Sequence, residues 1–306
     1  MERKSLREKI VQDFKKHKRK YLIIFPVLLY FILFHYKPMY GVIIAFKRYK
    51  PNRGIWGSDW VGLQNFIRFF KDIYFTRLLR NTFTISFLSL IFSFPMPIFL
   101  AILLNEIKNM KFKKAVQTIT YMPHFIAMVV MCGMVTSFCQ TNGLINEIIE
   151  FFGGTRTNLL MKQAYFYPIY IVSEIWKNIG WDSIIFLAAL SGIDQEQYEA
   201  ARVDGAGRIK QMIYITLPGL LPTISILLIL KMGQVLSVGY EKILLLYQPV
   251  TYEVADVIST YTYRKGLIEA DYSYSTAINM FNSVINLIFL NLSNKLSKKA
   301  GQSGLY

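Results

Sequence analysis

The sequence predicts an all-α integral membrane protein with six transmembrane helices. Three observations lead to this fold class: 53% of the 306 residues are hydrophobic, the mean hydropathy is +0.33, and the formal net charge is nevertheless +16. Apolar spans joined by basic loops combine these properties. A nucleic-acid-binding protein could also carry such a charge, but the basic residues of this chain flank apolar runs. The pattern therefore favours a membrane protein over a partner of nucleic acids.

Six segments are long and apolar enough to cross a bilayer, which takes about 20 mainly apolar residues. In chain order they are 21–36, 82–104, 118–139, 165–192, 216–238 and 276–294. The first is short for a span, so its outer end is expected to lie a turn or more further on. Together they predict a six-helix domain over residues 21–296, between a basic arm at 1–20 and a short tail at 297–306.

Basic residues at the span ends predict the orientation, because loops rich in Lys and Arg stay in the cytoplasm. The arm, the residues around the start of the tail and the loops 105–117 and 193–215 carry such residues, and six spans place all of them on one side. Both termini are therefore expected in the cytoplasm. The first span follows nine basic residues without a cleavage site, which is typical of an uncleaved signal anchor. The loop 37–80 also holds nine basic residues and runs against the rule, although long loops translocate with less regard to charge.

The loop 37–80 contains an aromatic and glycine-rich stretch from Gly54 to Phe66. Trp56 and Trp60 in this stretch have two interpretations. They are either anchors at the membrane interface, where tryptophan is enriched, or part of a surface that meets an external partner.

Residues 194–218 predict a helix, a turn, a second helix and a stop. Asp194 is suited to cap the first helix, with Gln197 three residues later. Asp204 and Gly205 form a turn signal at its end. Leu217-Pro218 is expected to end the second helix at the membrane. An ordinary amphipathic loop helix would be the alternative interpretation.

The spans also contain polar residues, which are costly in a bilayer and usually face a bundle interior or a water-filled cavity. They fall on one face of the fourth span, on the fifth span and along a stripe of the sixth: Glu174, Asn178, Trp181 and Asp182; Lys231 and Gln234; and Asn279, Asn282 and Asn286. Amides, carboxylates and an indole ring suit a sugar, whose hydroxyls need hydrogen bonds and whose ring face stacks on aromatics. We expect the faces of the fourth and sixth spans to line one cavity.

The same polar residues could instead hold helices together, because Asn and Ser form hydrogen bonds between transmembrane helices. For any single residue of the set this second interpretation is favoured. Lys231 could in addition pair with Glu174 or Asp182 as a structural ion pair.

Catalytic and metal sites are not indicated. The three histidines, His17, His35 and His124, are isolated, and no metal-ligand spacing is present. The chain contains neither a Gly-x-x-x-x-Gly-Lys-Ser phosphate loop nor a nucleophile–base pair. We therefore expect no metal and no cofactor bound by this chain itself.

Several strings resemble a known family. Residues Glu199 to Pro218 resemble the EAA loop of permeases of ABC importers. Val61-Gly-Leu-Gln-Asn-Phe66, Asn81-Thr82, Leu103-Leu-Asn105 and Tyr121-Met-Pro-His-Phe-Ile126 resemble carbohydrate permeases, in particular the LplB-like branch for oligosaccharides and polysaccharide fragments.

The resemblance implies a type I ABC importer permease fold in a bacterial plasma membrane. The loop 194–218 would then dock into a cytoplasmic ATPase subunit, with the contact carried by Glu199, Ala200, Ala201, Asp204, Gly205, Leu217 and Pro218. The small side chains of Ala200 and Ala201 would let the helix sit deep in a groove.

The implied partners are a second permease subunit in a heterodimer, two ATPase subunits that bind ATP and Mg²⁺, an extracellular solute-binding protein and a carbohydrate. An importer of peptides, amino acids or phosphate remains the alternative.

Overall fold

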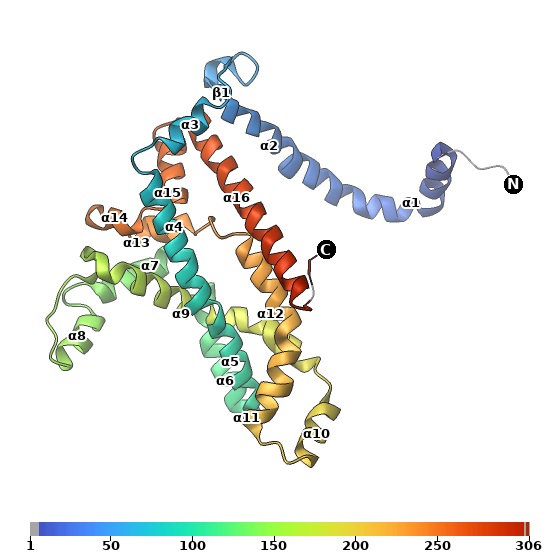
Figure 1. Cartoon of the computed structure of the whole chain (residues 1–306), viewed down its shortest axis with the longest axis vertical. Coiled ribbons are helices and arrows are strands. Elements are labelled where there is room, and N and C mark those ends of the chain that lie inside the picture. Colours follow the sequence, from blue (N-terminus) through green and yellow to red (C-terminus); the bar gives the residue numbers. More distant parts are fainter. Residues whose placement is uncertain (1–5, 303, 306) are drawn as a thin grey trace.

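The computed structural model describes residues 6–302, 304 and 305, and within residues 6–15 it describes only the side chain of Phe14. Parts of the expected basic arm and of the tail therefore lie outside the described residues. The described chain is helical except for loops and one short hairpin, in which β1 (Lys47–Arg48) pairs antiparallel with β2 (Asp59–Trp60). Figure 1 shows this hairpin at one end of the molecule and α10 at the opposite end.

The helices of the first half of the chain are α1 (Leu6–Phe31), α2 (Lys37–Met39), α3 (Gln64–Phe70), α4 (Phe75–Leu88), α5 (Pro95–Glu106), α6 (Met110–Tyr121), α7 (Met128–Cys139) and α8 (Leu144–Phe151). Those of the second half are α9 (Gln163–Ser191), α10 (Gln195–Val203), α11 (Arg208–Gln211), α12 (Leu217–Met232), α13 (Tyr240–Leu246), α14 (Tyr252–Ala255), α15 (Ile258–Tyr263) and α16 (Tyr272–Lys299).

Five helical segments within the described residues are long and apolar enough to cross a membrane. They are Lys16–Phe46, Phe75–Glu106, Met128–Phe151, Arg208–Met232 and Tyr272–Lys299. The fourth expected span corresponds to α9, which is not among these five. At 29 residues it is long enough, but it carries Glu174, Lys177 and Asp182. Charged residues inside a membrane domain usually face its interior.

The first span extends beyond the end of its apolar run, as expected from the sequence. Its apolar helical segment runs to Phe46, well beyond residue 36, and its helix is kinked at His17. None of the residues in its most apolar window is buried in this chain. In Figure 1, α1 and α2 project away from the other spans. The side chains of this helix are therefore left to lipid or to another subunit.

Prolines do not end three of the spans, because a wider turn precedes each of them. π-Helical turns lie at Ile32–Tyr36 before Pro38, at Ser89–Ser93 before Pro95 and at Met212–Thr216 before α12. The N–H of Leu217 donates to the carbonyl of Met212, five residues back, and the helix continues through Pro218. Such a turn moves the carbonyl with which a proline ring would collide. The predicted stop at Leu217-Pro218 is therefore wrong.

The third expected span, 118–139, is not one helix. It is divided into α6 and α7 by a 3₁₀ turn at Met122–Phe125, and Ile126 and Ala127 have extended backbones. The turn contains Pro123, which offers no N–H to a preceding turn. The carbonyl groups that this break leaves free accept hydrogen bonds from Lys177 of α9.

The segment between α12 and α16 forms a packed layer. Ile243 and Leu246 of α13 and Val257 before α15 are buried together with residues of α7 and α9. Asp256 is fully buried and makes a two-point ion pair with Arg264, at 2.8 and 2.6 Å.

Candidate functional site

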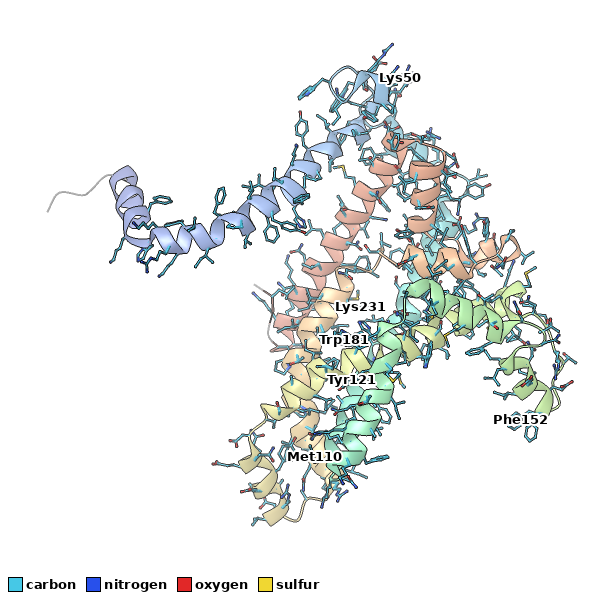
Figure 2. All side chains as sticks on the ribbon, turned by 180° about the vertical axis from the view of Figure 1, so that it is seen from behind. Lys50, Met110, Tyr121, Phe152, Trp181 and Lys231 are labelled. Carbon is cyan, nitrogen blue, oxygen red and sulfur yellow. The ribbon has the colours of Figure 1, made fainter. Side chains whose placement is uncertain are left out.

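Six of the polar residues predicted within the spans line one cavity of about 670 Å³ between α5, α9 and α12. They are Glu174, Asn178, Trp181, Asp182, Lys231 and Gln234. Figure 2 shows Trp181 and Lys231 near the middle of the molecule, between Lys50 at one end and Met110 towards the other. The rest of the lining is mostly aliphatic, with Ser93 and Pro97 from the second span. A few polar groups in an apolar hollow of this size are typical of a small-molecule site.

The carboxylate of Glu174 is held on one side by the second span. The hydroxyl of Ser89 donates to Oε2 of Glu174 at 2.6 Å, and that of Ser93 lies at 3.4 Å from the same oxygen. The other oxygen, Oε1, lies 3.8 Å from Nζ of Lys231. The predicted pairing of Lys231 with Glu174 is confirmed, whereas no ion pair joins Lys231 to Asp182 among the described residues.

The indole of Trp181 is fixed by aromatic contacts but keeps one part free. Its ring stacks on His124 with a centroid distance of 4.5 Å and an interplanar angle of 2°, and it meets Phe125 edge to face. Nδ1 of His124 lies 3.3 Å from Oδ1 of Asn178. Because 42% of Trp181 remains exposed, the ring can still stack against a ligand in the cavity.

The asparagines of α16 do not line this cavity, so the expectation of a shared cavity is wrong. Oδ1 of Asn286 accepts from the backbone N–H of Leu236 at 2.9 Å, and its Nδ2 donates to Ser237 at 2.9 Å. Asn286 thus joins α16 to the end of the fifth span. Asn282 is buried, with no hydrogen-bond partner for its Oδ1, and Asn279 is exposed. The stripe therefore does not act as one face: Asn286 bonds to the fifth span, Asn282 is buried and Asn279 is exposed.

Sequence reasoning missed two buried lysines, Lys177 on α9 and Lys242, which bonds to α9. Nζ of Lys177 donates to the carbonyl oxygens of His124, at 3.1 Å, and Ile126. Nζ of Lys242 donates to the carbonyl of Tyr170 at 2.6 Å and lies 4.1 Å from the centre of the Tyr170 ring. Lys177 lies within an apolar span, three residues after Glu174. A charged residue at such a position was the signal in the sequence that could have identified it. The ammonium of Lys177 thus holds the break between α6 and α7, and that of Lys242 joins α13 to α9.

The segment 194–218 forms the helix, turn and helix that the sequence predicts. Asp194 caps α10 by accepting from the N–H of Glu196, whereas Gln197 takes no part in a capping box. Gly205 has a φ of +77°, and the N–H of Ala206 donates to the carbonyl of Ala201 at 2.8 Å. This is a Schellman ending, which requires a left-handed residue such as glycine.

The same segment is exposed at the tip of the molecule. None of the residues of α10, which include Glu199, Ala200 and Ala201, is buried, and Val203 at its end is 88% exposed. One contact joins it to the span behind it: the hydroxyl of Tyr198 lies 3.0 Å from that of Thr216. The segment therefore combines a rigid internal geometry with a free surface and a direct link to the fifth span.

Comparison with known proteins assigns this architecture to a family. Residues 74–300 match the family model described as "Binding-protein-dependent transport system inner membrane component". The chain belongs to this family. It is therefore a membrane permease subunit of an ABC importer and not an enzyme, and ATP hydrolysis is carried out by a partner subunit.

Two relatives match nearly the whole chain. The chain is 45% identical to the polygalacturonan/rhamnogalacturonan transport system permease protein YteP of Bacillus subtilis, over 99% of this chain and 95% of that protein. It is 44% identical to the protein LplB of the same species, over 95% and 92%.

Two solved structures match over nearly the whole chain. One is the crystal structure of a bacterial ABC transporter that imports the acidic polysaccharide alginate, with a TM-score of 0.88, 43% identity and coverage of 95% of this chain and 99% of that one. The other shows a bacterial alginate ABC transporter in complex with an alginate pentasaccharide-bound periplasmic protein, with a TM-score of 0.89, 43% identity and coverage of 96% and 99%. The predicted type I ABC importer permease fold is confirmed.

Proposed function

We propose that this permease forms the path by which an ATP-driven importer takes up an acidic oligosaccharide, a short chain that contains uronate units. The observation that carries the proposal is the cavity lined by Trp181, Asn178, Gln234 and Lys231. An indole offers a face to an apolar sugar ring, the amides offer hydrogen bonds to hydroxyls, and the ammonium offers a partner to a carboxylate.

The relatives support the same substrate class. One is named for polygalacturonan and rhamnogalacturonan transport, and the matched structures belong to alginate importers. An importer of peptides, amino acids or phosphate is not favoured by these matches.

The proposed assembly contains a second permease subunit, two ATPase subunits and an extracellular solute-binding protein. The matched complex includes a periplasmic protein with bound pentasaccharide, which supports the last partner. Each ATPase subunit would bind ATP and Mg²⁺. The tip formed by α10 and Gly205 would enter a groove of one ATPase subunit, and its link through Tyr198 to Thr216 would carry motion into the fifth span.

The proposed orientation places this tip and both termini in the cytoplasm, and the β1–β2 hairpin outside. The basic residues of the arm and of the loops 105–117 and 193–215 support it. Exposed Trp56 and Trp60 on the hairpin would then lie at the outer membrane surface.

Uptake by the reconstituted transporter tests the substrate class. The complete complex in proteoliposomes, with its solute-binding protein, should accumulate labelled tetragalacturonate in the presence of ATP. Trp181→Ala should raise the KM about fivefold, because a stacking contact is worth about 1 kcal/mol.

Trp176→Ala is the matched control, because Trp176 lies on the same helix but lines a separate apolar groove beside Pro168 and Val172. It should leave the KM unchanged. Equal losses in both variants would contradict the assignment of the cavity, and failure of the wild type to import any uronate oligosaccharide would contradict the substrate class.

A further inference from the structure

A second cavity, of about 210 Å³, adjoins the first, and the two share three lining residues: Glu174, Lys231 and Gln234. The larger cavity continues from these residues along Trp181 and Asp182, and the smaller one along Tyr170 and Ser237.

The two cavities follow one another along the spans. In the second span, residues 83–90 line the smaller cavity and residues 93–97 the larger one. In the fifth span, which runs in the opposite direction, residues 227–230 line only the larger cavity and residues 235–239 only the smaller one. The smaller cavity therefore lies towards the hairpin and the larger one towards α10, with the Lys231–Glu174 ion pair at their junction.

The two partners of this ion pair are held unequally. Glu174 is anchored by Ser89 and has an 18% exposed side chain, whereas the side chain of Lys231 is 43% exposed. The distance of 3.8 Å between Nζ and Oε1 is longer than a hydrogen bond. Among the described residues, Glu174 is the one carboxylate paired with Lys231. The ammonium thus has unused donors directed at open volume.

The pair differs from the contacts that hold the helices together. Asn286 makes two hydrogen bonds of 2.9 Å to the end of the fifth span, and Lys242 makes one of 2.6 Å to a buried carbonyl. The Lys231–Glu174 contact is longer than these hydrogen bonds and borders two cavities, and the Lys231 side chain is 43% exposed. A carboxylate that enters from either cavity could approach Lys231 more closely than Glu174 does, and such charge-assisted hydrogen bonds are strong.

We propose that the Lys231–Glu174 ion pair closes the junction between the two cavities, and that a uronate carboxylate of the cargo opens it by taking Lys231 from Glu174. Lys231 is then the residue that selects an acidic sugar, and Glu174 is its counterion in the empty transporter. Gln234, which borders both cavities, offers its amide to a hydroxyl of the sugar that occupies the junction. This inference rests on the proposed function, because it takes the cargo to carry carboxylates.

The test compares three variants in the reconstituted complex, with uptake of tetragalacturonate normalised to folded protein. Lys231→Gln removes the selecting charge and should raise the KM about tenfold or more. Glu174→Gln keeps the hydrogen-bonding shape but removes the competing charge, so the KM should fall several-fold. Lys231→Arg retains the charge and should keep the KM within about twofold of the wild type.

Opposite shifts of the KM in Lys231→Gln and Glu174→Gln are the distinguishing result. A pair that only holds helices together would lose thermal stability in both variants, with the KM per folded molecule unchanged, and this outcome would overturn the inference. A rise of the KM in both variants would also overturn it. The proposed function fails separately, if the wild-type complex imports no uronate oligosaccharide.

Discussion

Gly180 shows how a single residue without a side chain positions the cavity. It lies on α9, where this helix crosses α6, and a Cβ built on it would be 2.1 Å from the carbonyl oxygen of Thr120. A backbone atom cannot move aside cheaply. Its neighbour Trp181 can reach His124 because the two helices approach this closely.

Gly180→Ala should therefore destabilise the folded protein by about 1–3 kcal/mol, as overpacking usually does. Gly133→Ala on α7 is the matched control, because nothing lies within 4 Å of its Cβ position. It should be neutral or slightly stabilising, since alanine favours a helix. Thermal melting in detergent checks both variants, and equal melting temperatures would contradict the close crossing.

The carboxylate of Asp72 links three tyrosines near the end of the molecule that carries the hairpin. It accepts hydrogen bonds from the hydroxyls of Tyr261 and Tyr274 and from the N–H of Tyr74. Burial raises the pKa of the Asp72 carboxyl, but these hydrogen bonds together outweigh burial and hold the pKa below its ordinary value of 3.8. A depressed pKa stabilises the folded state above the unfolded pKa, and that contribution is lost as the pH falls through the folded pKa.

Asp72→Asn should thus lower the melting temperature at neutral pH and reduce its further decline on acidification below about pH 4. Melting curves of wild type and variant between pH 3 and pH 7 measure this. Parallel pH dependences would show that Asp72 does not contribute to acid stability.

At the scale of elements, the end of α10 depends on one backbone conformation. Gly205 has φ +77° and open space around its Cβ position, so a larger side chain would cause backbone strain and no collision. Such strain costs a non-glycine residue roughly 1–2 kcal/mol.

Gly205→Val should leave the protein folded in the membrane but reduce ATPase retention on pull-down and ATP hydrolysis stimulated by cargo. Gly207→Ala is the control, because Gly207 has a φ of −70° and equal space. Normal uptake by Gly205→Val would show that this turn does not couple the subunits.

The spans themselves could be predicted, but their interruptions could not. Apolar runs locate the second, fifth and sixth spans because lipid requires long apolar segments. The break between α6 and α7 lies inside an equally apolar run, and it is stabilised by Lys177, which is more than 50 residues away in sequence. Likewise, the sequence around Pro218 predicts a stop, while a π-helical turn keeps the helix continuous. Local patterns do not contain these tertiary contacts.

The same limit applies to the candidate site. The polar face of the fourth span and the two polar residues of the fifth were found from helical spacing, and the structure brings them together around one cavity. The asparagines of α16 have equally regular spacing, but Asn286 bonds to the end of the fifth span and Asn279 is exposed. Spacing reveals that residues share a face, whereas the fold decides what that face meets.

At the scale of the whole molecule, the topology gives a direct prediction. A cysteine at exposed Asn52, in the hairpin, should react with an impermeant maleimide from outside intact cells, and one at Gly207 only after the membrane is opened. Cys132 and Cys139 are buried and should remain unlabelled. Labelling of Asn52→Cys from the cytoplasmic side alone would contradict the proposed orientation.

In the proposed transporter, acidic oligosaccharide passes through the cavity between α5, α9 and α12. A cryo-electron microscopy map of the assembled complex, trapped with tetragalacturonate by ATPase subunits that cannot hydrolyse ATP, would show where the sugar lies. We predict density for a sugar ring against the indole of Trp181 and a carboxylate beside Nζ of Lys231. Sugar density along the asparagine face of α16, with this cavity empty, would show that the cargo takes another path.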